Sequence, residues 1–219
     1  MIMKALRVEL KAMTASFRYP MFAVSYQPTY KVPPLSTIYG LLSAAKGEKV
    51  HVWDLAIGYD FSHEGEGVDL ERILEYGGEK KTKPVSYQGS NIVQRQFLYN
   101  CTLNLYISDL DFKKYFEKPY YTLLLGRQTD LAMVTRIEEI NLEKKNNVSV
   151  KNTMIPFDGK VPGQIVSLPS DFTDEPQRKP IEVRPYCIVE SEQQIDIGYF
   201  DSELNKGVCL HEFDNKGKE

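Results

Sequence analysis

Residues 97–107, FLYNCTLNLYI, carry the longest clean alternation of apolar and polar side chains in the chain. Such a period of two is typical of a strand with one buried face, because successive side chains point to opposite sides of a sheet. Residues 5–13 (ALRVELKAM) and 54–62 (DLAIGYDFS) repeat the pattern. Residues 120–127 (YYTLLLGR) form a continuous apolar run, which suits a strand buried on both faces. We therefore predict four strands.

Two helices are predicted between these strands. In residues 36–46 apolar side chains recur at i, i+3, i+4 and i+7, Ser36 is a favoured N-cap, and Gly47 is a favoured stop. The second helix begins after Ser108 and ends before Pro119. Strand, helix, strand, strand, helix, strand is the βαββαβ order of ferredoxin-like folds, and one large group of these binds single-stranded RNA.

Residues 63–96 interrupt this order and are too long for an ordinary connection. Apolar spacing over residues 70–74 predicts a short amphipathic helix inside this insertion. Beyond residue 127, short strand-like runs recur between glycines and prolines. The predicted fold is therefore α+β: a ferredoxin-like (RRM-like) unit at 1–127, interrupted by the insertion, and a β-rich C-terminal region at 128–219 packed on it.

An aromatic, basic loop precedes the first predicted helix directly. Exposed tyrosines suit the stacking of single-stranded bases. The first turn of a helix favours anions, because its free N–H groups and the helix dipole are positive there, and two hydroxyls and two cations lie close by in sequence. The alternative is a capped core helix after a loop whose tyrosines simply pack. The candidate residues are Arg18, Tyr19, Tyr26, Tyr30, Lys31, Ser36 and Thr37.

The charge of the chain argues for a local interface with nucleic acid. A net charge of −3 and a pI near 5.8 argue against indiscriminate polyanion binding, which requires a broad positive field. Residues 1–53 hold seven Lys/Arg against two Glu, residues 54–78 one against seven acidic residues, and residues 79–100 four against one. Two basic segments around an acidic one fit a focused groove, although solvated faces give the same pattern. The second segment adds the candidates Lys80, Lys81 and Lys83.

Motifs of several other classes of protein are absent from the sequence. Neither a GxxxxGK[ST] loop nor a GxSxG elbow occurs. The three histidines are isolated from one another and from the three cysteines, which argues against a zinc site and a disulfide framework. We expect neither a metal nor another cofactor. Because no run of about 18 apolar residues and no secretory signal occurs, we expect a cytoplasmic protein without a membrane span.

Metal-free RNA cleavage remains an alternative on residue types alone. A general base would deprotonate a ribose 2′-OH while a cation stabilises the developing charge. The right residue types are Tyr30, Lys31, His51 and the lysines of residues 80–83. Tyrosine is a poor base at its usual pKa of about 10, however.

Four segments resemble the CRISPR-associated family five. They are FRYPMFAVSYQPTYKVPPLSTIYGLLSAA (17–45), LLLGRQTDL (123–131), VSLPSDF (166–172) and GYFDSELNKGVCLHEF (198–213). The first is specific, because its loop, double proline, Ser-Thr pair and helix occur together in order. Members are RAMP-superfamily subunits of type I Cascade surveillance complexes that hold the five-prime handle of crRNA, and the type I-B branch looks most similar.

The resemblance implies a ferredoxin-like palm with an inserted thumb hairpin, and it implies roles for single residues. Arg18 and Arg127 would pair with phosphates. Ser36 and Thr37 would present the helix terminus to the handle, and Gly126 would let the backbone approach closely. The positions that match the family's motifs are Phe17, Arg18, Tyr30, Pro34, Ser36, Thr37, Gly40, Gly126 and Arg127.

One branch of the family, in type I-C, cleaves crRNA precursors with a tyrosine and an adjacent Lys-His pair. Tyr30 is the candidate tyrosine here, but no Lys-His dipeptide occurs in the sequence. We therefore predict a non-catalytic RNA-binding subunit that caps the handle and nucleates assembly of the complex for antiviral defence. The implied partners are crRNA, the backbone and large subunits, and, indirectly, target DNA. The alternatives are a metal-independent endoribonuclease and a protein-binding adaptor.

Overall fold

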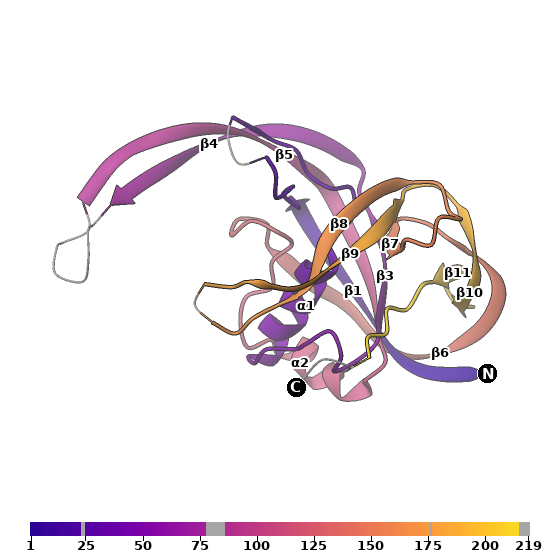
Figure 1. Cartoon of the computed structure of the whole chain (residues 1–219). Coiled ribbons are helices and arrows are strands. Elements are labelled where there is room, and N and C mark those ends of the chain that lie inside the picture. The colour runs from indigo at the N-terminus through magenta and orange to yellow at the C-terminus, as the bar shows by residue number, and fades with distance from the viewer. Residues whose placement is uncertain (23–24, 78–85, 176, 215–219) are drawn as a thin grey trace.

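The computed structural model describes residues 1–22, 25–77, 86–175 and 177–214. Strands dominate these residues and form one large and one small sheet (Figure 1). The helical elements are α1 (Leu35–Lys46), the 3₁₀ helix η1 (Leu110–Phe112) and α2 (Lys113–Glu117). The strands are β1 (Ile2–Ala15), β2 (Tyr26–Gln27), β3 (Ile57–Ser62), β4 (Gly65–Gly77), β5 (Ser86–Ile107), β6 (Ala132–Val150), β7 (Thr153–Pro156), β8 (Gln164–Phe172), β9 (Pro180–Val189), β10 (Gln193–Asp201) and β11 (Lys206–Val208).

Four strands of the large sheet carry the predicted βαββαβ order. They lie side by side as β6, β1, β5 and β3, each antiparallel to its neighbour. Val8 at the centre of β1 is opposite Leu105 on one side and Ile137 on the other. Helix α1 connects β1 to β3, and α2 connects β5 to β6. The predicted α+β fold is confirmed.

The large sheet continues past residue 127. Strands β10 and β11 extend it beyond β6, so its hydrogen bonds join residues on both sides of the predicted domain boundary. The division at residue 127 stays a prediction. The small sheet has the order β7, β9, β8, and its Met154, Leu168 and Tyr186 belong to the same buried cluster as Leu42 of α1. This sheet therefore packs on the main core at α1.

The prediction of a strand at residues 120–127 is wrong. The amides of Tyr120 and Tyr121 donate to the carbonyls of Ala45 and Ala44 at 3.0 and 2.9 Å, at the end of α1. The segment is therefore held against the helix and is not part of a continuous strand. Its apolar character comes from the burial of Leu123 and Leu125, and the fourth strand of the βαββαβ order is β6.

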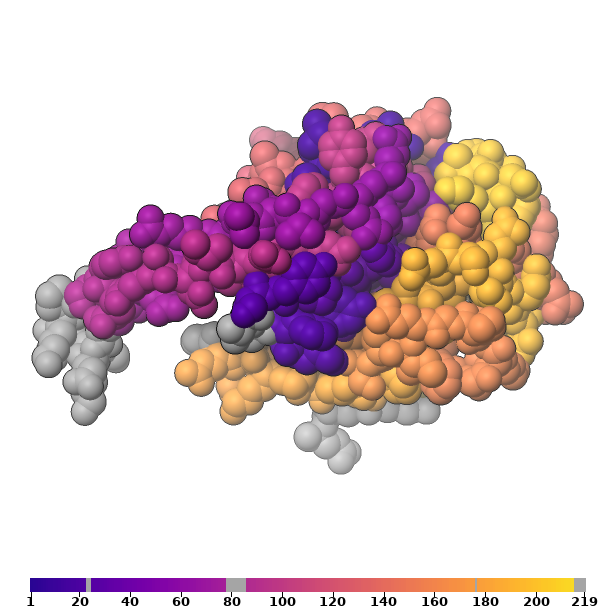
Figure 2. Space-filling view, turned by 90° about the horizontal axis from the view of Figure 1, so that it is seen from above, coloured from indigo at the N-terminus to yellow at the C-terminus, as the bar shows by residue number. Residues whose placement is uncertain are grey.

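The prediction of a helix at residues 70–74 is also wrong. These residues belong to β4, which pairs antiparallel with β5 along its whole length, with Leu70 opposite Gln94. The hydrogen bonds to β5 decide the conformation, because the apolar stripe has no core against which a helix would pack. The β4–β5 hairpin extends away from the body of the protein (Figures 1 and 2). The predicted lysines at positions 80, 81 and 83 lie outside the described residues.

The helix caps differ from the prediction in two places. Helix α1 begins at Leu35 with Pro34 as its N-cap, so Ser36 lies inside the first turn and makes no cap hydrogen bond. Asp109, and not Ser108, caps η1, and the Ser108 hydroxyl instead accepts a hydrogen bond from the Ala56 amide at 3.0 Å. The predicted stop at Gly47 is confirmed, with a left-handed φ of 83°.

No helix in the described part of the chain is long and apolar enough to cross a membrane.

The protein should lose stability in acid because of the buried His211. Its Nε2 lies 2.8 Å from the Met154 carbonyl, its Nδ1 has no hydrogen-bond partner among the described residues, and burial lowers its pKa from 6.5 to about 4. As the pH falls, His211 is therefore protonated in the unfolded chain before it is protonated in the folded protein. Between pH 6.5 and 4 the free energy of unfolding should fall by about 3 kcal/mol through this residue, with no further loss below pH 4.

Urea unfolding at several pH values measures this dependence. His211→Gln keeps a donor for the Met154 carbonyl and should flatten the pH profile. An equally steep profile in His211→Gln would show that other groups cause the acid sensitivity.

Candidate nucleic-acid interface

Tyr30 lies in the core of the loop before α1. Its side chain is 2% exposed, and its ring is stacked on that of Tyr19 with centroids 3.7 Å apart. Burial, with a smaller contribution from Tyr19, raises the pKa of Tyr30 to about 12. Tyr30 is therefore a packing residue in this structure, as in the alternative reading of the loop, and its ring is not free to stack on a base.

Other side chains of the loop are accessible. Arg18 is exposed, and its backbone bridges to Thr29 across the loop. Phe22 and Tyr26 are 44% and 42% exposed, and Tyr26 lies on β2, which pairs in parallel with β5 at the base of the hairpin. Tyr19 is partly buried, and its hydroxyl bonds the side-chain amide of Gln164. Arg18 and Tyr26 thus remain available to a ligand.

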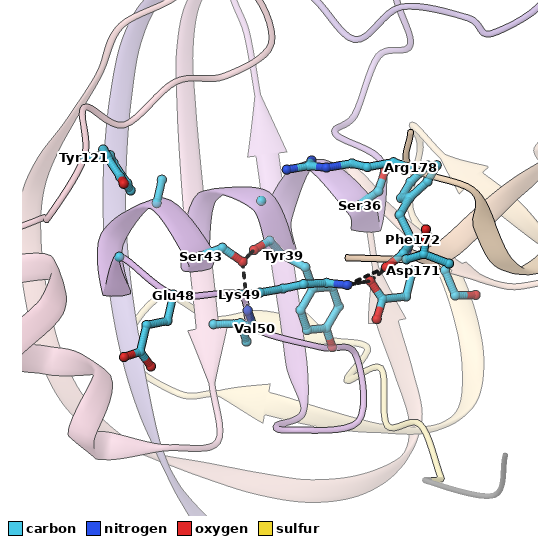
Figure 3. A pocket seen from close by; sticks show the side chains of 15 residues that line it. Ser36, Tyr39, Ser43, Glu48, Lys49, Val50, Tyr121, Asp171, Phe172 and Arg178 are labelled. Carbon is cyan, nitrogen blue, oxygen red and sulfur yellow. Dashed lines mark hydrogen bonds and ion pairs between the residues drawn. The ribbon is translucent and has the colours of Figure 1, made fainter. Parts of the chain in front are cut away.

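A cleft of about 340 Å³ follows α1 from Ser36 in its first turn to Gly47 beyond its end, and the β8–β9 hairpin lines its other side (Figure 3). Ser36 lines this cleft, and Arg178 lies beside it. The amides of Thr37 and Ile38 both donate to the Pro34 carbonyl, at 2.9 and 3.2 Å. Two first-turn amides are therefore already bonded, so anion binding here would rely more on side chains than the sequence suggested.

The cations of this cleft differ in their availability. Lys49 Nζ bonds the Phe172 carbonyl at the end of β8 (Figure 3). It also lies 2.6 Å from Asp174, so it is held by β8 and the loop that follows. Arg178 is exposed. Sequence reasoning missed Arg178, because it lies in the loop between β8 and β9, far along the chain from α1. An isolated arginine in a polar loop gives no sequence signal of this placement.

Lys31 does not lie free beside the helix terminus. Its ammonium forms an ion pair with Glu66 at the base of the β4–β5 hairpin, and this pair lowers the pKa of Glu66. Lys31 also lines a pocket of about 310 Å³ together with His63 and Lys151. The structure thus brings a histidine beside Lys31, a grouping that the sequence did not predict.

Gly126 lies in close contact with backbone of the protein itself and not with open space for a ligand. Its φ is +117°, and a Cβ at this position would lie 2.0 Å from the carbonyl oxygen of Ser16. The backbone of Ser16, which directly follows β1, occupies the space that the resemblance assigned to a nucleic-acid backbone. The glycine is required because no other residue fits this contact and this φ together.

Arg127 is paired with carboxylates in the free protein. The side chain of Arg127 is 10% exposed. Its Nε and Nη2 donate hydrogen bonds to the Asp130 carboxylate at 3.1 and 3.0 Å. Its Nη1 lies 2.7 Å from Glu71 and 3.5 Å from Asp69. Sequence reasoning missed Asp130 and Glu71. The i, i+3 spacing of Arg127 and Asp130 was a local signal for the first, whereas the second depends on the path of the hairpin.

The histidines do not form a common site. His51 Nδ1 lies 2.7 Å from Asp171, and its ring is stacked on Trp53 with centroids 4.5 Å apart, beside β8. His211 is buried against β3, and His63 lines the pocket of Lys31. Within the described ranges, no three His, Cys, Asp or Glu side chains lie close enough together to hold a metal ion.

Comparisons with known proteins agree with this architecture. A sequence model of the family described as CRISPR-associated protein (Cas_Cas5) matches residues 5–194. A search of the curated proteins gave no match. Three solved structures have a similar fold: a chain of a CRISPR RNA-guided surveillance complex (TM-score 0.55, 15% identity, 87% of this chain and 91% of that chain), a chain of the type III-B Cmr-beta complex bound to cognate target RNA (0.53, 13%, 86% and 86%), and a CRISPR protein from Archaeoglobus fulgidus (0.53, 11%, 96% and 100%). Because the family match covers most of its length, the chain belongs to the CRISPR-associated Cas5 family.

Proposed function

We propose that this chain is a non-catalytic subunit of a type I CRISPR Cascade complex, of the I-B branch, which binds the five-prime handle of crRNA and nucleates assembly of the backbone. Its partners would be crRNA, the backbone and large subunits and, through them, target DNA. The observation that carries the proposal is the long β4–β5 hairpin, which projects from the ferredoxin-like sheet of a Cas5-family chain and has arginines at its base.

The loop before α1 supports handle binding by this surface. Arg18 and Tyr26 are exposed beside the base of the hairpin, since β2 pairs with β5 there. Ser36, in the first turn of α1, and Arg178 line the cleft beside this helix. A guanidinium and an aromatic ring are the side-chain types that bind phosphate and stack on bases in single strands.

The state of Tyr30 supports a non-catalytic role. With a pKa of about 12 the phenol is protonated at neutral pH, so it is a poor general base. One observation favours the alternative of a metal-independent endoribonuclease, namely the pocket that contains Lys31, His63 and Lys151. A histidine and two lysines are suitable for proton transfer and charge stabilisation at a 2′-OH.

Handle binding should depend on Arg18 and on salt. Removing one charge-assisted phosphate contact costs about 1.5–3 kcal/mol, so Arg18→Ala should weaken affinity for handle RNA by roughly 10-fold to 150-fold. A few phosphate contacts on a single strand predict a slope of log K against log salt of about −2 to −4 for the wild type. Electrophoretic mobility shifts across a salt series measure both quantities.

Arg136→Ala is the matched control, because it removes the same charge from an exposed position on β6. A flat salt response, or equal losses in the two variants, would contradict the proposed interface. The same incubations with precursor RNA, run on denaturing gels, should show no cleavage. Site-specific products that disappear in His63→Ala would establish the endoribonuclease instead.

A further inference from the structure

Three arginines line one hollow at the base of the β4–β5 hairpin. Arg72, Arg95 and Arg127 surround it together with Gln128 and Thr129, and its volume is about 480 Å³. Arg95 is opposite Asp69 in the β4–β5 register, and Arg127 comes from the turn that follows Gly126. Segments distant in sequence thus bring three arginines to one hollow.

Glu71 bridges two of these arginines. Its Oε1 lies 2.7 Å from Arg127 Nη1, and its Oε2 lies 2.8 Å from Arg95 Nε. Each oxygen of one carboxylate therefore faces a different guanidinium group. Two guanidinium groups around one oxyanion is an arrangement that also suits phosphate.

The two arginines are not equally well satisfied by this carboxylate. Arg127 is fixed by the fully buried Asp130, and its guanidinium lies 5.6 Å from the ring centroid of Phe97. Arg95 Nε is buried and has an ion-pair distance to Glu71, but it makes no aligned hydrogen bond to any described residue. The Glu71 carboxylate is planar and already bonds Arg127, and its second oxygen is not in line with the N–H of Arg95 Nε. The oxygens of a tetrahedral phosphate do not lie in one plane, so a phosphate can accept from both arginines.

We propose that Arg95 and Arg127 form a binding site for a backbone phosphodiester of single-stranded RNA, and that the Glu71 carboxylate occupies this site until RNA displaces it. The choice of RNA rests on the proposed function; the oxyanion site rests on the geometry alone. With Glu71 in place, the three arginines are balanced by Asp69, Glu71 and Asp130. Displacing Glu71 leaves one net positive charge at a preorganised pair of donors.

This arrangement predicts selectivity for an extended ligand. A single free phosphate must displace Glu71 with the contacts of one site, whereas an RNA strand that also contacts the α1 loop distributes this cost over several contacts. Removing the carboxylate while keeping its shape should therefore increase affinity for RNA lacking any handle sequence.

Glu71→Gln in the full chain tests the site, with labelled oligouridylate as the probe in fluorescence anisotropy. Gaining one charge-assisted contact should raise affinity roughly fivefold or more and steepen the slope of log K against log salt by about 0.7. Glu75→Gln is the matched control: it removes the same charge from β4 at a position opposite Gly89. It should change affinity less than twofold, and adding Arg95→Gln to Glu71→Gln should abolish the gain.

Equal gains in Glu71→Gln and Glu75→Gln, with an unchanged salt slope, would overturn the site, because a long-range field would then explain both. Thermal unfolding of each variant shows whether it is folded. Asp69→Asn, which removes a longer contact to Arg127, should give a smaller gain in affinity in the same direction.

Inorganic pyrophosphate is titrated in parallel. Binding of pyrophosphate as tight as that of oligouridylate would overturn the assignment to an RNA strand. If the wild type does not bind handle RNA, but Glu71→Gln still binds pyrophosphate more tightly than the wild type does, the proposed function would be rejected and the oxyanion site supported.

Discussion

Gly126→Ala should lower the free energy of unfolding by at least about 3 kcal/mol. The new Cβ would lie 2.0 Å from the Ser16 carbonyl oxygen, a contact with backbone that no rotamer change relieves. The φ of +117° adds strain of about 1–3 kcal/mol for a residue with a side chain. Denaturant unfolding followed by circular dichroism measures the loss, and handle affinity should fall with it, because Gly126 positions Arg127.

Gly40→Ala provides the control for this substitution. Gly40 lies within α1, and a Cβ there would have no atom within 4 Å. Alanine is favoured over glycine inside a helix, so this variant should gain about 0.5–1 kcal/mol. Similar stabilities for the two variants would mean that the Ser16 backbone does not lie against Gly126 as described.

Asp130→Ala should cost about 3–5 kcal/mol of unfolding free energy. Asp130 is fully buried and accepts hydrogen bonds from the Thr14 hydroxyl at 2.6 Å and from the Arg127 amide at 2.9 Å, besides the Arg127 guanidinium. Truncation leaves a mostly buried arginine without the carboxylate that bonds its Nε and Nη2, and leaves a hydroxyl without its acceptor. Urea unfolding at neutral pH measures the loss.

Asp69→Ala separates burial from charge in the same network. Its side chain is 55% exposed and touches Arg127 at 3.5 Å, so the loss should stay at or below about 1 kcal/mol. If both aspartates cost the same, the buried network around Arg127 is not what holds the turn after Gly126. If Asp130→Ala folds but binds RNA poorly, positioning of Arg127 is the cause.

Local pattern alone determined several features of this protein. The alternation in residues 97–107 and 5–13 predicted the two central strands, because a sheet with one buried face enforces a period of two. The helical spacing before Gly47 predicted α1 and its end, since both depend on neighbours within one or two turns. Family membership also follows from the sequence, because the family model matches residues 5–194.

Tertiary structure decided where the same local pattern allows two outcomes. Residues 70–74 have helical spacing, but β5 supplies backbone partners, so they form a strand. Residues 120–127 are apolar enough for a strand, but their first amides bond the end of α1 instead. In both cases the deciding partner lies 16 or more residues away along the chain, so no short window of neighbouring residues contains it.

The same limit applies to the candidate site. The sequence named Tyr30 and Arg127 as candidate RNA-binding residues, but the stacking on Tyr19 and the surrounding core remove the Tyr30 ring from the surface. Arg127 and Lys31 are cations whose availability depends on which carboxylates the hairpin brings to them, here Glu71 and Glu66. Sequence determines which charges are present, and only the fold determines which of them neutralise one another, because ion pairing acts over a few ångströms in space and is independent of separation along the chain.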